Sequence, residues 1–407
     1  MGKPLLLWKL EQLVRLGIER CIIVCSRNNE KTIKDVTVPH GLEAVYVCQE
    51  GEGQGNGVLA AKPHIGNDPM IILNGSDWYD DASLEPFLTA GKQEILLGAV
   101  RMDSYFPGGY LVVDDTLAVS GIIEKPGAGK EPSPWVRVVI DRIEHPQKFF
   151  SYVEKTGDNP AAGYEQAITE AISDGISCGA LAVSGIWLPI KYPWHILAVA
   201  REALKTITGQ SIAPDVQIKK DVILEGPIII EAGVRIFEGV KIVGPTYIGK
   251  NTIVGNNTMI RESILGDNCV TGFSSDITRS VIGNGCWFHT NYVGDSVLDK
   301  NVSMGSGAVC ANLRLDDGCI SASVKGERTC TSKNKLGSLI GKNVRIGVNV
   351  SIMPGICIGS GSFISSGLTI TQNIPADSFV KFHEQTFDIV PNTCNETKSR
   401  EEFAKKL

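Results

Sequence analysis

The segment Phe288–Ser296 gathers side chains whose types suit acid–base chemistry. His289 is followed at short spacing by Tyr292, Gly294 and Asp295, so that an imidazole, a phenol and a carboxylate occur in one stretch. Histidine has an ordinary pKa close to neutral pH and can therefore accept a proton from an attacking nucleophile. We take His289 as a candidate general base, and a histidine packed into the wall of the fold is the structural alternative.

Further polar and basic residues flank this segment. Arg279 precedes it, Asn312 follows it, and Lys325 and Lys335 lie in a long polar excursion over residues 315–338. A long loop that leaves a regular repeat usually has a function. The cations are candidates for neutralising phosphate groups, although a solvated loop would also accept Lys325 and Lys335.

The elements that must position these residues show a six-residue period. Neither a helix nor an ordinary strand gives this period, whereas one short strand and one turn per six residues is typical of a parallel β-helix, in which the aliphatic residue points into a prism. An ordinary β-sandwich rich in Ile and Gly is the alternative. The aliphatic ladder consists of Ile212, Ile218, Leu224, Ile230, Ile236, Ile242, Ile248, Val254 and Ile260, and then of Ile340, Ile346, Ile352, Ile358, Ile364 and Ile370.

The first half of the chain has a different pattern, in which short apolar strands alternate with helical stretches. This alternation predicts a parallel, doubly wound α/β sheet, with ligands beyond the carboxyl ends of its strands. Strands are expected at 21–25, 44–48, 70–73, 95–101 and 110–124, helices at 4–17, 57–64, 83–90, 164–174 and 193–205, and a Pro/Gly loop at 127–135.

Length and composition bound the organisation of the chain. At 407 residues two domains are expected: an α/β domain over 1–205 and a β-helix over 206–382. A polar tail over 383–407 follows, with a short helix at 398–407. The net charge of −6 and the lack of a basic tract argue against nucleic acid and anionic membranes as partners.

Cysteine and histidine usage points to a reducing compartment without a metal site. The 11 cysteines form no CxxC pair, and we expect reduced thiols in a cytoplasmic protein. The six histidines are not clustered. No run of 18 apolar residues and no signal peptide is present.

Several motifs in residues 1–205 resemble those of the sugar-1-phosphate nucleotidyltransferase family. The resemblance implies that their residues are remnants of a nucleotide site. The motifs are Gly2-Lys3-Pro4-Leu5-Leu6, Gln49 with Gly53-Gln54-Gly55-Asn56-Gly57, Asn74-Gly75, Glu124-Lys125-Pro126, and Trp187–Trp194; the implied nucleotide-binding remnants are Gln49, Gly53, Gly55, Asn74, Gly75, Glu124 and Lys125.

The chain departs from that family in three ways. The family opens with a strand and a phosphate-binding G-x-G-T-R loop that precede the first motif found here. The family's two Mg²⁺-binding carboxylates align with Ser76 and Pro189, which cannot replace anionic oxygen ligands. Asp77 is one residue late, and in an extended chain its side chain points to the opposite side. We therefore predict no metal site, and Mg²⁺ only if nucleotidyl transfer survives; the sheet should lack its first strand, leaving a gap that is either loose or closed by another strand.

Residues 210–382, with the intact HxxYxGD motif inside a hexad ladder, resemble left-handed β-helix acetyltransferases. The match is closest to the acetyltransferase half of the bifunctional N-acetylglucosamine-1-phosphate uridylyltransferase/glucosamine-1-phosphate acetyltransferase family, especially its archaeal type. The resemblance implies transfer from acetyl-CoA to an amino-sugar 1-phosphate in nucleotide-sugar biosynthesis, by a homotrimer with sites between subunits. It implies His289 as base, Tyr292 and Asn312 as orienting groups, and Arg279, Lys325 and Lys335 as phosphate-binding residues.

Two other readings stay open at the level of the sequence. The chain could be a sugar-1-phosphate nucleotidyltransferase that uses UTP or dTTP, with the β-helix as a trimerisation scaffold. It could also be a non-catalytic regulator that binds nucleotide sugars. The sequence does not identify the amino sugar.

Overall fold

A computed structural model describes residues 1–91, 93–156, 163–324, 326–383 and 386–391. The contacts divide the chain into two compact units: Lys3–Pro189, and Ile190–Leu407 together with Met1–Gly2. The expected boundary at residue 205 thus falls later than the division in the structure. The helix over 195–205 belongs to the second unit.

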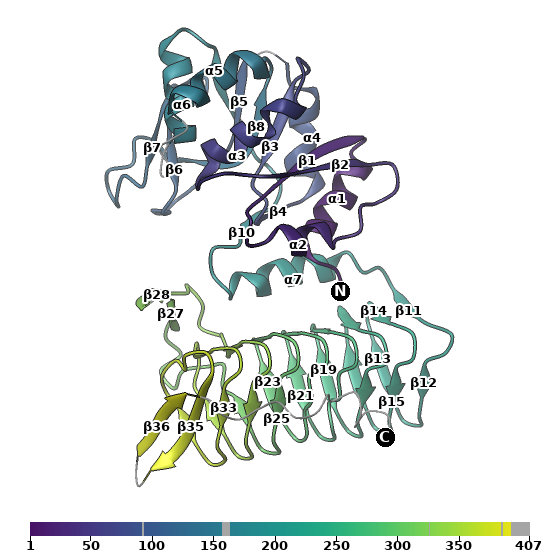
Figure 1. Cartoon of the computed structure of the whole chain (residues 1–407). Coiled ribbons are helices and arrows are strands. Elements are labelled where there is room, and N and C mark those ends of the chain that lie inside the picture. Colours follow the sequence, from purple (N-terminus) through teal and green to yellow (C-terminus); the bar gives the residue numbers. More distant parts are fainter. Residues whose placement is uncertain (92, 157–162, 325, 384–385, 392–407) are drawn as a thin grey trace. The chain divides into compact units, whose positions relative to one another are not determined.

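The first unit is built on a mixed six-stranded sheet (Figure 1). Its strands are β3 Met70–Leu73, β5 Ile95–Arg101, β6 Gly109–Val113, β7 Val119–Glu124, β8 Trp135–Ile143 and β9 Cys178–Ala182. Strand β8 runs antiparallel to β3, β5 and β6, whereas β5 and β9 are parallel. The sheet is therefore not purely parallel as expected, and β8 was not predicted. The expected strand over 110–124 is a hairpin, because Asp114 accepts hydrogen bonds from the backbone N–H groups of Thr116 and Ala118 and closes a turn.

The first two strands pair with each other, apart from the six-stranded sheet. Strand β1 (Arg20–Cys25) pairs in parallel with β2 (Glu43–Cys48) in a sheet of their own. Within the described ranges no strand pairs with the other edge of β1, and β3 pairs with β8 alone. Of the two outcomes left open, closure by another strand is therefore not observed in the described part of the chain.

Helices cover this sheet and surround a core that includes Leu97, Leu111, Phe149, Val153 and Ile168. The helices are α1 Leu5–Arg15, α2 Glu30–Lys34, α3 Gln54–Ala61 followed by a 3₁₀ turn Lys62–His64, α4 Asp81–Thr89, α5 Pro146–Thr156 and α6 Gly163–Ser173. Three of the helices expected here, near 4–17, 83–90 and 164–174, are confirmed, and the expected stretch 57–64 covers the end of α3 and the 3₁₀ turn. Helix α5 was missed. A short antiparallel pair, β4 (Asp77–Tyr79) with β10 (Trp187–Pro189), completes the unit.

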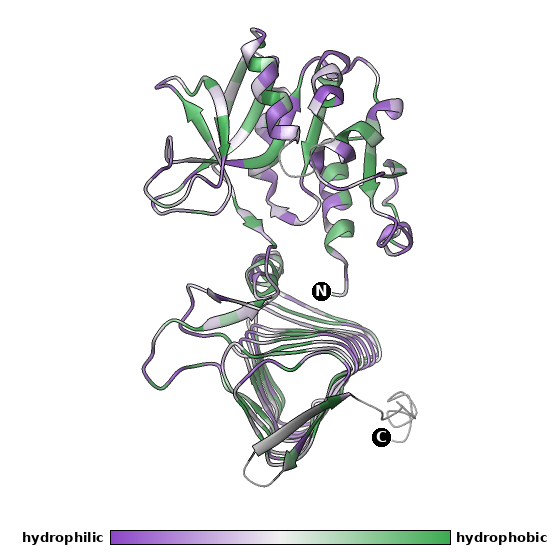
Figure 2. Cartoon of the chain, turned by 60° about the vertical axis from the view of Figure 1, so that its left-hand side comes forward, coloured by the Kyte–Doolittle hydropathy of each residue, from purple (hydrophilic) through white to green (hydrophobic). Residues whose placement is uncertain are grey.

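The second unit is a left-handed parallel β-helix whose coils stack into a three-sided prism (Figures 1 and 2). The first face consists of β11 Gln210–Ile212, β14 Ile228–Ile230, β17 Thr246–Ile248, β20 Ile264–Leu265, β22 Val281–Ile282, β24 Val297–Leu298, β29 Leu339–Ile340 and β32 Cys357–Ile358. The second face consists of β12 Gln217–Ile218, β15 Arg235–Ile236, β18 Ile253–Val254, the single bridges at Val270 and Trp287, β25 Ser303–Met304, β30 Arg345–Ile346, β33 Phe363–Ile364, β35 Ser378–His383 and β36 Thr386–Pro391. The third face consists of β13 Ile223–Glu225, β16 Lys241–Val243, β19 Met259–Arg261, β21 Asp276–Thr278, β23 Tyr292–Gly294, β26 Val309–Cys310, β31 Ser351–Ile352 and β34 Thr369–Ile370.

The aliphatic ladder forms the core of this prism. From Ile230 to Ile370 its side chains are buried, which confirms the hexad interpretation. Ile212 and Ile218 are instead 38% and 42% exposed, because the first coil has a neighbouring coil on one side only. The prism also continues beyond Ile370, since β35 pairs with β33 and β36 adds an antiparallel strand. A polar tail from 383 was therefore wrong for residues 386–391; the helix expected at 398–407 lies outside the described residues.

Helix α7 (His195–Lys205) packs on the first face of the prism through Leu197, Ala200 and Leu204. The long excursion after Asn312 forms an antiparallel hairpin, β27 (Ser321–Val324) with β28 (Glu327–Cys330), which projects from the coils in Figure 1. A disulfide joins Cys319 to Cys330 at its base. The expectation that every cysteine is a free thiol is therefore wrong for this pair; Cys394 lies outside the described residues.

Candidate active site

His289 lies in the bend that leads from the second face of the prism into β23, and it is exposed. Its main chain is held on both sides, because its N–H donates to Asn291 Oδ1 at 2.7 Å and its carbonyl accepts from the Ser275 hydroxyl. The structure places His289 at the surface of a rigid corner and not within the wall of the prism.

Tyr292, Gly294 and Asn312 approach one another at the other end of β23. A Cβ atom at Gly294 would lie 2.5 Å from the Tyr292 hydroxyl oxygen and 2.7 Å from Asn312 Nδ2. Glycine at this position therefore lets a phenol and an amide lie directly over the backbone. Burial raises the pKa of the Tyr292 phenol, and the nearby Asp295 carboxylate raises it further, so the phenol is neutral near pH 7.

Asp295 connects these groups to Arg279. Arg279 donates from Nε and Nη2 to the two oxygens of Asp295, each at 2.7 Å, and Asn312 Nδ2 donates to Asp295 Oδ2 at 2.5 Å. The hydrogen bond to Asp295 raises the pKa of Arg279. We refer to Arg279, Tyr292, Asp295 and Asn312 as the Asp295 cluster. Strand β23 thus carries His289 at the corner before it and the Asp295 cluster at the corner after it.

The lysines of the excursion differ in their surroundings. Lys335 is exposed and forms an antiparallel bridge with Leu313, beside Asn312. Lys325 lies outside the described residues. Lys333, which was not among the predicted site residues, is partly buried; burial lowers its pKa, the Arg201 charge lowers it further, and the Asp295 carboxylate raises it. Two described lysines therefore lie close to the Asp295 cluster.

The remnants of the nucleotide motifs surround the start of α3 and the end of β3. Gly53 precedes α3 with φ of +88°, and Gln49 donates to the carbonyl of Gly51 at 3.1 Å. Gly55 is buried, and Asn74 follows β3 directly, with Gly75 exposed after it. Glu124 and Lys125, at the end of β7, form a partly exposed ion pair at 3.6 Å. These predicted nucleotide-binding residues thus lie in turns at the ends of strands and at the start of α3.

Ser76 and Pro189, which stand where the resembled family has its Mg²⁺ ligands, do not fit a metal ion. Pro189 pairs with Asp77 across β10 and β4, and Ser76 is the residue before Asp77. Ser76 offers one hydroxyl, which donates to Asn74 Oδ1 at 3.1 Å, and Pro189 offers no side-chain ligand. Within the described residues no cluster of three or more His, Cys, Asp or Glu side chains is arranged to hold a metal.

Asp77 does not substitute for the missing ligands. It is 4% exposed and accepts hydrogen bonds from Trp187 Nε1 at 2.8 Å and from Asn74 Nδ2 at 3.0 Å. Burial raises its pKa, against the opposing effect of these bonds and of the Lys9 charge. The carboxylate is therefore occupied in a buried polar cluster. The expected orientation away from Ser76 is not observed, because Ser76 lies in the turn before β4 and its hydroxyl bonds to the same Asn74 amide as Asp77.

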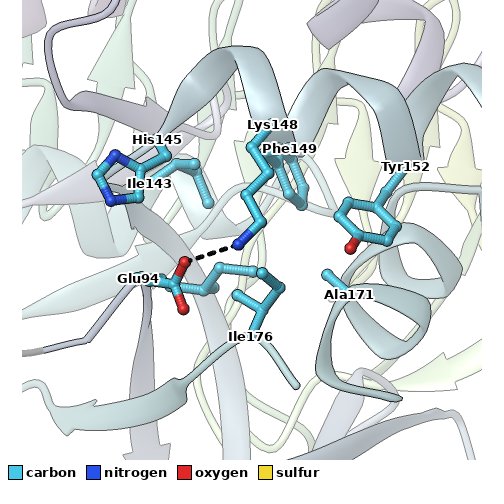
Figure 3. A pocket seen from close by; sticks show the side chains of 9 residues that line it. Glu94, Ile143, His145, Lys148, Phe149, Tyr152, Ala171 and Ile176 are labelled. Carbon is cyan, nitrogen blue, oxygen red and sulfur yellow. Dashed lines mark hydrogen bonds and ion pairs between the residues drawn. The ribbon is translucent and has the colours of Figure 1, made fainter. Parts of the chain in front are cut away.

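A separate small pocket in the first unit is lined by Ile95, Ile143, Tyr152 and the Glu94–Lys148 ion pair (Figure 3). It lies at the edge of the sheet where β3 begins, because Met70 and Ile95 both pair with Ile143. The nucleotide motifs lie at the opposite edge, where β3 ends. None of the predicted site residues lines this pocket.

Known proteins are similar to this chain over both of its halves. The family model described as bacterial transferase hexapeptide (six repeats) matches residues 337–372. A bifunctional sugar-1-phosphate nucleotidylyltransferase/acetyltransferase from Sulfurisphaera tokodaii is 30% identical over 404 residues, covering 94% of this chain and 93% of its own length. The bifunctional protein GlmU from Methanocaldococcus jannaschii is 30% identical over 388 residues, covering 93% and 90%. Among solved structures, UDP-glucose pyrophosphorylase from Acinetobacter baumanii covers 50% of this chain and 83% of its own, with a TM-score of 0.40 and 20% identity.

Two features of the site escaped the sequence interpretation. Asn291, which holds the main chain of His289, was given no role in the sequence analysis. The available signal was that Phe288 and Val293 are five residues apart, where the repeat predicts six. Lys333 was overlooked in favour of Lys325 and Lys335, since a run of lysines in a loop gives no signal of which one lies near Asp295.

In the described part of the chain no helix is both long enough and apolar enough to cross a bilayer.

Proposed function

The chain belongs to the family of bifunctional sugar-1-phosphate nucleotidylyltransferases/acetyltransferases, and we propose that it transfers the acetyl group of acetyl-CoA to the amine of an amino-sugar 1-phosphate such as glucosamine 1-phosphate. The observation that carries this proposal is the position of His289 (exposed on a fixed corner of the prism, on the same coil as Tyr292 and Asp295 of the Asp295 cluster). The second part of the proposal is that the chain no longer catalyses nucleotidyl transfer.

The reaction requires a base and yields free CoA. The amine lone pair attacks the thioester carbonyl carbon, a C–N bond forms, and the carbonyl electrons move onto oxygen. His289 takes the proton that the nitrogen releases. The tetrahedral intermediate collapses with cleavage of the C–S bond, and the imidazolium of His289 gives its proton to the leaving thiolate to form CoA–SH. The products are the N-acetylated sugar phosphate and CoA.

Tyr292 and Asn312 supply neutral hydrogen-bond donors in this scheme. The raised pKa of Tyr292 keeps its hydroxyl protonated, and the Asn312 amide bonds to Asp295 and also to the Tyr292 oxygen. Such donors orient the sugar or stabilise the negative oxygen of the intermediate, and they are most effective when they do not have to reorganise. The bond between Asn312 and Asp295 provides that rigidity.

The phosphate groups of both substrates need cations. Arg279 uses Nε and Nη2 for Asp295, and Nη1 for Thr278 Oγ1 at 3.1 Å, so two of its five N–H groups are left for a phosphate. Lys335, exposed beside Asn312, and Lys333 are further candidates. Lys325 stays in the proposal on the family resemblance alone.

A homotrimer with shared sites is consistent with the apolar surface around His289. Phe273, on the preceding coil at the same corner, is 59% exposed, and Val348, at that corner further along, is 46% exposed. Large apolar side chains at a rigid corner lose exposed area when a second copy of the chain covers them. Light scattering at micromolar concentration tests this: a monomer contradicts a shared site.

The loss of nucleotidyl transfer rests on Ser76 and Pro189. Transfer of a nucleotidyl group depends on positioning and on neutralising charge, and neither position offers an anionic ligand for Mg²⁺. Asp77 is engaged by Trp187 and Asn74 and is not free to replace them. The nucleotide motifs around Gln49 and Glu124 then act as scaffold.

A paired assay on one preparation of the full chain tests both parts of the proposal. Release of CoA is measured with acetyl-CoA and glucosamine 1-phosphate, with galactosamine 1-phosphate as the alternative acceptor. Release of pyrophosphate is measured with Mg²⁺, UTP or dTTP and a sugar 1-phosphate. We expect CoA release only. Pyrophosphate release at the rate of the M. jannaschii relative refutes the loss, and failure of CoA release with either acceptor refutes the acetyltransferase.

A further inference from the structure

The coil that carries His289 is shorter than its neighbours at one corner of the prism. The coil before it passes from Val270 on the second face to Asp276 on the third, and the coil after it from Ser303 to Val309. The coil of His289 closes the same corner from Trp287 to Tyr292, with one residue fewer. Its backbone must therefore cut across the corner, and some other group must fill the space beneath it.

The side chain of Asn291 occupies this space. It is 4% exposed, and its Nδ2 donates to the carbonyls of Gly305 at 2.8 Å and Ala308 at 2.9 Å on the following coil. Its Oδ1 accepts the N–H of His289 at 2.7 Å. One amide thus bonds to three backbone groups, one on its own short turn and two on the following coil, where a buried polar group without a partner would be costly.

Asn291 ends a row of buried polar side chains that runs along the inside of this corner. Thr258 Oγ1 donates to the carbonyl of Gly272 at 3.4 Å, the Ser275 hydroxyl donates to the carbonyl of His289, and Asn291 donates to that of Gly305. Each member bonds to the next coil. Among the three, only Asn291 also reaches back to the residue two positions before it on its own coil.

His289 is consequently fixed from three directions. Asn291 holds its N–H, Ser275 holds its carbonyl, and Gly272 lies directly against its backbone. A Cβ atom at Gly272 would lie 2.4 Å from the His289 oxygen and 2.6 Å from its Cα, so only glycine admits this approach. No hydrogen bond of the His289 ring itself occurs within the described residues, and the ring direction is set through the backbone.

We infer that Asn291 is a positioning residue for His289: its amide sets the backbone of the short corner and thereby aims the imidazole at the acceptor amine. The inference rests on the proposed function for the role of His289. Misplacement of a catalytic group by about 1 Å can cost on the order of 100-fold in rate. Loss of the amide should therefore act on the chemical step more than on substrate binding.

The test uses the full chain and compares two variants with a matched control. Asn291→Leu is similar in size and removes all three bonds. Asn291→Asp, which burial favours in the neutral form, keeps an acceptor for the His289 N–H and one donor for a carbonyl. Thr252→Val is the control, since Thr252 is also fully buried and donates to a carbonyl of the next coil at 2.9 Å, but at a different corner of the prism.

Three quantities are measured for each protein: kcat and KM for acetyl transfer as functions of pH, the free energy of unfolding in urea, and the rate at which diethyl pyrocarbonate modifies His289, followed by mass spectrometry. We expect Asn291→Leu to lower kcat about 10- to 100-fold, with KM changed about twofold or less, and to alter the pH profile and the modification rate of His289. Asn291→Asp should restore part of kcat. Thr252→Val should lose stability while keeping kcat, the pH profile and the modification rate.

The outcomes separate this inference from the proposed function. A wild type that releases no CoA refutes the proposed function, and the modification rate of His289 then still decides whether Asn291 sets that residue. An active wild type whose Asn291 variants keep kcat, the pH profile and the modification rate refutes the inference alone. If Asn291→Leu does not fold, Asn291→Asp against Thr252→Val gives the same decision.

Discussion

Arg279 and Asp295 form a two-point ion pair, with Nε and Nη2 each 2.7 Å from a carboxylate oxygen. The pair lies on adjacent coils, and Asp295 is mostly buried while also accepting from Asn312. A planar guanidinium matches both oxygens of a carboxylate at once, which an ammonium group cannot do. Arg279 therefore acts first on the geometry of Asp295, and only its remaining N–H groups are available to a substrate.

Replacing Arg279 with lysine should expose this role. Arg279→Lys keeps the charge but loses the two-point contact, so that Asp295 and Asn312 shift and kcat for acetyl transfer falls about tenfold. The control is Arg261→Lys, because Arg261 pairs with Asp276 one coil earlier, through Nη2 alone at 2.8 and 3.0 Å from the two carboxylate oxygens, without a link to Asn312. Equal losses of kcat in both variants would mean that the pair has no special place in the site.

Replacing His289 should remove activity without unfolding the chain. A positioned general base contributes about 10²- to 10⁴-fold, so His289→Gln should lower kcat by that order. Since His289 is exposed, the free energy of unfolding should change by about 0.5 kcal/mol or less. Stopped assays of CoA release and urea unfolding measure the two effects, with Thr290→Ala as the neighbouring control. A His289→Gln variant with wild-type kcat contradicts the assignment of the base.

Adding one methyl group at Gly294 should disturb the Asp295 cluster selectively. The new Cβ in Gly294→Ala meets the ends of the Tyr292 and Asn312 side chains, at 2.5 and 2.7 Å, and both can swing away. We expect kcat to fall about tenfold with a shift of only a few degrees in Tm. Gly66→Ala, where nothing lies within 4 Å of the added atom, is the control. Unchanged kinetics in Gly294→Ala would show that the two groups do not contact the substrate.

Buried Lys9 should make the stability of the first unit depend on alkaline pH. Burial lowers the pKa of Lys9 from 10.5 to about 8, and its Nζ has no hydrogen-bond partner in the described structure. The folded state therefore releases the proton before the unfolded state does, so the cost of burying the charge is fully present below pH 8 and is lost as pH rises to 10.5. The free energy of unfolding should rise over this window by an amount on the order of 1–3 kcal/mol.

Lys9→Met should abolish that rise. Urea unfolding followed by tryptophan fluorescence at pH 7.5 and 10.5 measures the change in unfolding free energy, since the ring centroids of Trp8 and Trp78 lie 5.6 Å apart in this unit. Lys3→Met, at an exposed ion pair with Glu11, is the control and should keep the wild-type rise. A wild type whose stability does not increase between the two pH values contradicts the buried charge.

The periodic parts of the chain were the predictable ones. The spacing of the aliphatic ladder identified the prism because every hexad repeats the same burial. Burial is incomplete only in the first coil, at Ile212, Ile218 and Leu224, where no preceding coil covers them. Strand β8 and helix α5 were missed, since Arg137, Asp141 and Arg142 interrupt the apolar pattern of a strand that is nevertheless buried. There Arg137 and Asp141 pair with each other inside the sheet, which no local pattern reveals.

For the candidate site, the sequence predicted His289, Tyr292 and Asn312 as site residues, but not how they are held. The link from Asn312 to Asp295 joins residues 17 positions apart and depends on coil stacking. The role of Asn291 follows from one missing residue in the hexad count, which becomes meaningful only when the neighbouring coils are seen to keep the full count. The expected orientation of Asp77 away from Ser76 assumed an extended chain, whereas Ser76 lies in a turn and both side chains bond to Asn74.

The disulfide between Cys319 and Cys330 encloses both strands of the projecting hairpin in a covalent ring. A protease that cut the tip between β27 and β28 would therefore leave the two fragments attached, and they would separate on a gel only after treatment with a thiol. Asn312 and Leu336, whose backbone hydrogen bond closes the excursion, lie outside the ring. A nicked chain should for that reason keep the Asp295 cluster in register as long as the sulfur bridge is intact.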